Sequence, residues 1–167
     1  MNSTLKPRVL IFIVAYNAER TIQDVLRRIP ASLSAYGTEI LIIDDSSRDG
    51  TFERARELGR EKSLPFPLTV LFNPVNQGYG GNQKLGFHYA IRNGFDAVAL
   101  VHGDGQYAPE RLPDLLTPLL NGEADAVMGS RMIGRFDALR GGMPAYKYLG
   151  NKNPHRNSEP PAPFFAE

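Results

Sequence analysis

Three polar residues that could bind a metal ion follow an apolar run near the middle of the chain. The run Val98 to Val101 contains β-branched residues, and His102, Asp104 and Gln106 come directly after it. This pattern predicts a buried strand with polar residues at its carboxyl end, where ligands bind in open α/β sheets. If the chain stays extended there, alternate side chains lie on one side and could hold a divalent cation beside a diphosphate. The alternative is a polar turn after a core strand.

Two adjacent carboxylates, Asp44 and Asp45, follow a second apolar run, Glu39 to Ile43. Neighbouring residues of a strand point to opposite sides, so we expect one carboxylate to face a cleft, and we choose Asp45 because it comes later. There it could accept hydrogen bonds from a nucleobase or a ribose hydroxyl. The alternative is that both carboxylates only cap the next turn and helix.

A glycine-rich loop from Asn76 to Gly81 leads into a third helical pattern. The amino end of a helix favours anions, and Asn76 and Lys84 could donate hydrogen bonds to a nucleotide. The loop lacks the Gly-Lys-Ser/Thr ending of a Walker loop and the spacing of GxGxxG. Tight turn geometry alone would therefore also explain its glycines.

Alternating strands and helices must position the polar residues that follow each apolar run. Right-handed crossovers between such elements predict an α/β domain, with a mostly parallel sheet and helices on both faces. Each strand then ends at the same rim. Apolar runs predict strands at 9–14, 39–43, 68–72, 98–101 and 124–128. Apolar spacing predicts four helices: one at 18–29, one that begins at about 51, one that ends at about 93, and one at 109–120.

The composition is that of a soluble domain. The chain has 167 residues, 42% of them hydrophobic, with a net charge of +1 and no cysteine, which excludes disulfides and thiolate metal sites. No apolar run approaches the roughly 20 residues of a spanning helix, so we expect a cytoplasmic protein whose membrane contact is peripheral. Nothing in the sequence predicts a nucleic-acid partner.

The carboxyl end differs from the rest of the chain. From Arg131 to Arg156 there are six basic residues and one acid, a distribution that suits a solvated face, a phosphate-bearing substrate or an anionic membrane. Residues 151–167 include four prolines and few periodic apolar residues. We therefore expect one domain over 1–150 and an irregular proline-rich tail over 151–167.

Five ordered segments carry a family resemblance. They read VAYNAERTI, IIDDSSRDGT, NQGYGGNQKLGFHYA, VHGDGQYAPE and MGSR, and the resemblance that they carry covers about residues 8–150. Their order resembles family 2 glycosyltransferases, whose Rossmann-like GT-A fold binds nucleotide-diphospho-sugars. The group most similar to them comprises the dolichyl- or polyprenyl-phosphate mannosyltransferases and glucosyltransferases.

The resemblance implies roles for particular residues. Its reaction would transfer a hexose from GDP-mannose or UDP-glucose, with inversion, to a polyprenyl or dolichyl phosphate, with Mg²⁺ or Mn²⁺ at the leaving diphosphate. A lipid phosphate is already ionised at neutral pH, so no protein base is strictly required. The implied residues are Ala15, Tyr16 and Asn17 beside the nucleoside, Asp45 at the base or ribose, His102, Asp104 and Gln106 at the metal, with Asp104 catalytic, and Arg131 at phosphate.

The sequence departs from the family pattern in three places. His102 replaces the first aspartate of the DxD-type motif, which favours Mn²⁺, and Ala18 stands where the family often has glutamate. The chain also ends soon after the fifth expected strand, where family members continue into acceptor-side elements. Two alternatives follow: a truncated, non-catalytic nucleotide-sugar-binding remnant, and, from the paired Asp44 and Asp45, a receiver-like regulator.

Overall fold

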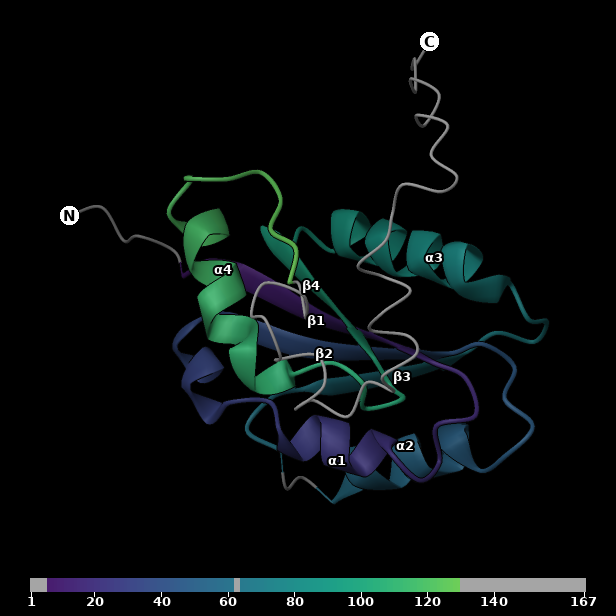
Figure 1. Cartoon of the computed structure of the whole chain (residues 1–167). Helices are drawn as coiled ribbons and strands as arrows, with labels where there is room; N and C mark the ends of the chain where they lie inside the picture. Colours follow the sequence, from purple (N-terminus) through teal and green to yellow (C-terminus); the bar gives the residue numbers. More distant parts are fainter. Residues whose placement is uncertain (1–5, 62–63, 130–167) are drawn as a thin grey trace, which may run out of the picture. The chain divides into compact units, whose positions relative to one another are not determined.

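The chain forms a parallel sheet of four strands flanked by helices (Figure 1). The structure is a computed structural model that describes residues 6–61 and 64–129. The elements are β1 (Arg8–Ala15), α1 (Ile22–Arg27), the short 3-10 helix η1 (Ala31–Ala35), β2 (Gly37–Asp44), α2 (Thr51–Arg60), β3 (Leu68–Phe72), α3 (Gly78–Arg92), β4 (Ala97–His102), the 3-10 helix η2 (Pro109–Arg111) and α4 (Leu112–Leu120).

The sheet brings the carboxyl ends of its strands together. Its order is β3-β2-β1-β4 and every pair is parallel. In the register, Val14 lies beside His102 and Ala15 lies beside Asp44, which in turn lies beside Phe72. The polar residues that follow each strand therefore share one rim.

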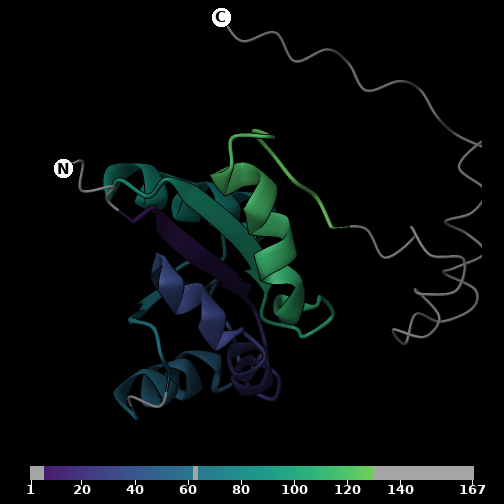
Figure 2. The ribbon, with the colours of Figure 1, turned by 90° about the vertical axis from the view of Figure 1, so that its left-hand side faces the viewer.

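Helices cover both faces of the sheet, as predicted. Odd-numbered residues of β1 such as Ile11 pack with α1, α2 and α4, whereas even-numbered residues such as Phe12 pack with Ala90 of α3. The side view shows α3 on one side of the sheet and α1 and α2 on the other (Figure 2). Because both faces are covered, the central strand β1 is apolar from Val9 to Ala15, and its residues 9–13 are at most 1% exposed.

The approach of α3 to the sheet is set by small residues. Asn82, Gly86 and Ala90, spaced four apart, form the buried stripe of the helix. A Cβ at Gly86 would lie 2.1 Å from Cε1 of Phe12. The middle of α3 thus packs closely on the Phe12 ring, which leaves no room for a side chain at position 86.

The fifth strand, expected over 124–128, is not formed. Residues 124–129 carry no strand, and Asp125 and Ala126 are exposed. A strand requires a hydrogen-bonded neighbour, and within the described residues β4 pairs only with β1. The short apolar run at 126–128 was therefore insufficient evidence for a strand.

Two further expectations concern the carboxyl end of the chain and membrane-spanning helices. The basic segment 131–156 and the predicted domain boundary at 150 lie outside the described residues. Over residues 6–61 and 64–129, no helix has both the length and the apolar character needed to cross a membrane.

Candidate functional site

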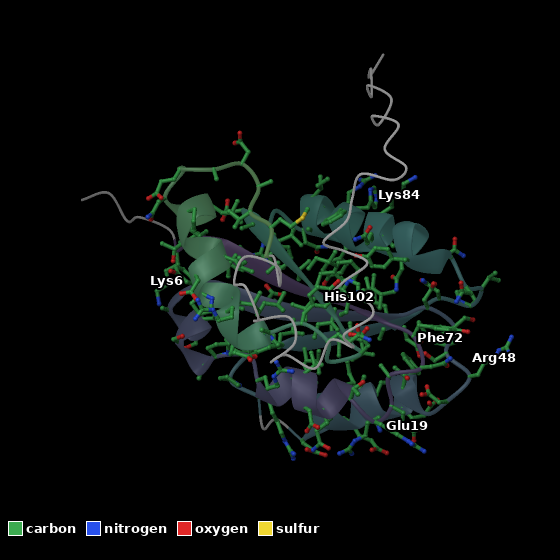
Figure 3. The ribbon with its side chains drawn as sticks, viewed as in Figure 1. Lys6, Glu19, Arg48, Phe72, Lys84 and His102 are labelled. Carbon is green, nitrogen blue, oxygen red and sulfur yellow. The ribbon has the colours of Figure 1, made fainter. Side chains whose placement is uncertain are left out.

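A cavity of about 640 Å³ opens at the carboxyl ends of β1, β2 and β4. This volume is in the usual range for small-molecule sites. The side chains of Arg48 and Phe72 mark the edge where the strands end (Figure 3). Six residues predicted from the sequence line the cavity: Ala15, Tyr16, Asp45, Asn76, His102 and Asp104.

Asp45 lies in the cavity wall and also holds the loop that begins α3. Its Oδ1 accepts hydrogen bonds from Asn73 Nδ2 and from the backbone N–H of Gln77, both at 2.8 Å. The carboxylate is only 4% exposed. The structure therefore places Asp45, rather than Asp44, at the cavity, while its contact with a ligand stays a prediction.

Asp44 points to the opposite side and is fully buried. Its Oδ1 accepts the backbone N–H of Ser47 at 3.0 Å and also the Ser47 hydroxyl, whereas Oδ2 has no partner among the described residues. Burial raises the pKa of Asp44, and the Ser47 hydrogen bonds only partly oppose that rise. The charged form of this carboxyl is thus disfavoured by the fold.

We expect Asp44 to make stability fall as pH rises. Because its pKa in the folded state is raised above the ordinary 3.8, the folded protein binds this proton more tightly than the unfolded chain. Lowering the pH from about 7 through the raised pKa should therefore increase the free energy of unfolding relative to an Asp44→Asn variant. Urea unfolding of both proteins between about pH 4 and pH 7 measures the difference, and two parallel pH profiles would contradict the assignment.

Asn17 connects the loop that follows β1 to the loop that follows β2 through hydrogen bonds. Its backbone has φ +51°, its N–H donates to Ser47 Oγ at 2.8 Å, and its Oδ1 accepts the N–H of Arg48 at 2.9 Å. Asn17 is not among the residues that line the cavity, although Tyr16 before it is. Its amide therefore shapes the loop that carries Arg48.

Arg48 lines the cavity but was missed by sequence reasoning. Of the described residues in the wall, it is the one lysine or arginine. It is also the sole cation between Asp44 and Gly50, a signal that the sequence did offer. Its guanidinium makes this part of the wall attractive to anions.

The start of α3 contributes two asparagines. Asn76 Nδ2 donates to the carbonyl of Asp45 at 2.8 Å, and its Oδ1 accepts the N–H of Gly78 at 2.9 Å. Asn82, also missed, donates from Nδ2 to the Ile43 carbonyl at 3.0 Å, and its buried Oδ1 has no partner among the described residues. Lys84 does not line the cavity and lies on the exposed side of α3 (Figure 3).

His102 is held between two tyrosine rings. Its ring centroid lies 4.9 Å from that of Tyr79 and 4.6 Å from that of Tyr107, and Tyr79 Oη lies 2.9 Å from His102 Nε2. Burial lowers the pKa of His102, and the nearby Asp104 carboxylate opposes this. The imidazole is therefore neutral at neutral pH. Tyr79 was missed because the loop was interpreted through its glycines, as an anion site or a tight turn, and not through its aromatic ring.

The chain does not stay extended after His102, so the expected alternation of three side chains was wrong. It turns at Gly103, and Gly105 adopts φ +75°, which glycine permits without strain. Within this turn, Asp104 Oδ1 accepts the N–H of Gln106 at 3.0 Å. His102 and Asp104 line the cavity, whereas Gln106 does not.

The rim suits a cation that a substrate helps to bind. No group of three histidine, cysteine or acidic side chains able to hold a metal occurs in the part of the chain that the structure describes. Asp104 presents an exposed carboxylate, but His102 Nε2 already has Tyr79 as a partner. Mg²⁺-like ions are commonly held by one or two carboxylates together with substrate phosphates and water, and Asp104 fits that arrangement.

Residues 10–164 match the profile of the family described as "Glycosyl transferase family 2". The chain belongs to this family. Family membership confirms the resemblance drawn from the five sequence segments and rules out the receiver-like alternative. Arg131, predicted to contact phosphate, lies within the matched range but outside the described residues.

Relatives and solved structures agree with this membership. The chain is 32% identical over 126 residues to undecaprenyl-phosphate mannosyltransferase of Micrococcus luteus, and this alignment covers 75% of this chain and 49% of that protein. It is 30% identical over 126 residues to dolichol-phosphate mannosyltransferase of Pyrococcus furiosus, and this alignment covers 75% of this chain and 34% of that protein. The chain thus spans about half or less of the length of these relatives.

A solved structure supports the fold assignment. Glucosyl-3-phosphoglycerate synthase from Mycobacterium tuberculosis, in complex with Mn²⁺ and UDP-glucose, aligns with a TM-score of 0.52 at 25% identity. The alignment covers 71% of this chain and 40% of that one. The parallel sheet with helices on both faces is therefore the GT-A type expected from the sequence.

Proposed function

We propose that the described residues form the donor site of a metal-dependent, inverting glycosyltransferase. In this proposal the protein moves a hexose from GDP-mannose or UDP-glucose to a polyprenyl or dolichyl phosphate. The observation that carries it is the rim cavity, whose wall combines Asp45, Arg48 and Asp104. The names of the relatives, which act on undecaprenyl and dolichol phosphates, support the acceptor class.

The nucleoside is proposed to lie against the carboxyl ends of β1 and β2. Ala15 and the half-exposed Tyr16 ring form one wall there, and Asp45 offers a carboxylate to a ribose hydroxyl or a base N–H. Asn17 supports this wall through its hydrogen bonds to the Ser47 and Arg48 segment. Asn76 completes it by fixing the loop before α3.

The diphosphate is proposed to lie between Arg48 and Asp104. A divalent cation bound there would neutralise the leaving diphosphate and orient it, and the solved relative that holds Mn²⁺ and UDP-glucose supports this choice of Mn²⁺ or Mg²⁺. Asp104 is its proposed protein ligand. His102 could join only by exchanging its Tyr79 contact, and Gln106 only by entering the cavity. Arg131 stays a proposed phosphate contact.

The acceptor side needs little from acid–base chemistry. A lipid phosphate oxygen is already a nucleophile at neutral pH, so it can attack the anomeric carbon directly from the face opposite the leaving group, which inverts the configuration. Such an acceptor is anchored in a membrane. The proposal therefore includes peripheral contact with the cytoplasmic face of a membrane.

The donor half of the proposal predicts a thermal shift. UDP-glucose or GDP-mannose with Mn²⁺, at about 100 times its dissociation constant, should stabilise the folded chain by about 2.7 kcal/mol. For a domain of this size that corresponds to a rise in melting temperature of about 5–10 °C. Differential scanning fluorimetry with each nucleotide sugar, with and without EDTA, measures it. An unchanged melting temperature with every donor would refute the donor site.

Transfer is tested separately. Incubation with radiolabelled donor and a short-chain polyprenyl phosphate should give labelled lipid. A thermal shift without any labelled lipid would favour the alternative of a nucleotide-sugar-binding remnant.

A further inference from the structure

We infer that Arg28 is a positioning residue, which clamps the turn carrying Asp104 so that its carboxylate is ready for the donor diphosphate. The inference rests on the proposed function. It concerns residues 103–108, which connect β4 to η2, together with Glu110 of η2. Of these residues, Gly103 and Asp104 line the cavity.

One guanidinium makes four hydrogen bonds across this connection. Arg28 Nη1 donates to the Gly105 carbonyl at 3.2 Å, and Nη2 donates to the Tyr107 carbonyl at 3.1 Å. Nε and Nη2 also reach the two carboxylate oxygens of Glu110 at 3.1 and 3.0 Å. The rigid planar fork of arginine suits such a set of acceptors, which a lysine cannot match.

Arg28 directly follows α1, and Thr21, which directly precedes it, holds the other end of the turn. Thr21, seven residues before Arg28, donates its hydroxyl to the Gly103 carbonyl at 2.6 Å. Between them, Val25 lies under Gly105, where an added Cβ would be 3.9 Å from Val25 Cγ2. Residues spaced by three and four share one helix face, so Thr21, Val25 and Arg28 form a continuous seam along the turn.

The seam matters because two glycines flank the proposed cation ligand Asp104. Asp104 Oδ1 accepts a hydrogen bond from the Gln106 N–H, and Gly103 and Gly105 flank Asp104 in sequence. Glycines give the backbone more freedom than other residues. Without the Arg28 contacts at residues 105–110, the carboxylate would sample several positions, and donor binding would have to restrict them.

The test compares Arg28→Ala, Arg28→Lys and a control, Arg54→Ala, in the full chain. The Arg54 side chain is 31% exposed against 38% for Arg28, and it hydrogen-bonds Glu57 and Gln23, neither of which belongs to the turn. Hydrogen exchange of peptides covering 103–111 is measured without ligand. Calorimetry then gives the affinity for UDP-glucose and GDP-mannose with Mn²⁺, and for UDP and GDP in EDTA.

For Arg28→Ala we expect at least tenfold faster exchange over 103–111 and at least tenfold weaker Mn²⁺-dependent donor affinity. Exchange in α2 and nucleotide affinity in EDTA should stay within about twofold, because an exposed ion pair contributes little to global stability. Arg28→Lys should recover only part of either loss, and Arg54→Ala should show neither.

Three results would overturn the inference. Unchanged exchange over 103–111 would show that Arg28 does not clamp the turn. Faster exchange with unchanged Mn²⁺-dependent affinity would show that the clamp does not serve the donor, and equal losses in Arg54→Ala would indicate general destabilisation. If the unaltered protein binds neither donor, the proposed function fails and the positioning role fails with it, while the exchange data still decide whether the clamp exists.

Discussion

Replacing Asp104 with asparagine is expected to weaken Mn²⁺-dependent binding of the nucleotide sugar at least 100-fold, which corresponds to about 2.8 kcal/mol. The substitution removes the one carboxylate that we assign to the cation. It keeps an oxygen that can accept the Gln106 N–H, so the turn should stay in place. Isothermal titration calorimetry with UDP-glucose and GDP-mannose measures the loss.

A matched control for this charge removal is Asp114→Asn. Asp114 is an exposed acid on α4 that pairs with Arg111 and does not line the cavity. It should leave donor affinity within about twofold, and both variants should melt within a few degrees of the unaltered protein. Full retention of Mn²⁺-dependent affinity in Asp104→Asn would remove Asp104 from the site.

Gly86→Ala should destabilise the fold by about 1–3 kcal/mol, as expected for overpacking. The new methyl group would lie 2.1–2.4 Å from three carbons of the Phe12 ring, which is fully buried in the sheet. Either α3 must move away from the sheet or Phe12 must leave its position. Urea unfolding monitored by far-ultraviolet circular dichroism measures the loss.

Gly80→Ala in the same helix should have the opposite sign. A Cβ there meets no atom within 4 Å, so only the helical preference of alanine remains, which is worth about 0.5–1 kcal/mol. The pair separates packing from propensity, because both substitutions are glycine to alanine in α3. Equal stabilisation by both would contradict the close contact of α3 with Phe12.

Much of the fold followed from local pattern. Apolar runs predicted β1, β2, β3 and β4. The run is unbroken in the central strand β1 from Val9 on, because a strand covered on both faces has few polar positions, whereas the edge strand β3 contains Thr69. The same logic failed at 124–128, where a shorter apolar run, 126–128, pairs with no strand among the described residues. Hydrophobicity shows that a segment can be buried, but pairing decides whether it is a strand.

The sequence by itself determined the family, the parallel sheet and the rim at which Asp45, His102 and Asp104 gather. Tertiary structure alone decided how those side chains are held: that Asp45 also accepts the Gln77 N–H before α3, that Tyr79 contacts His102, and that Thr21 and Arg28, which flank α1, hold the turn after β4. The physical reason is range. Strand periodicity is a property of neighbouring residues, whereas these hydrogen bonds join residues 23 to 82 positions apart, which no local pattern encodes.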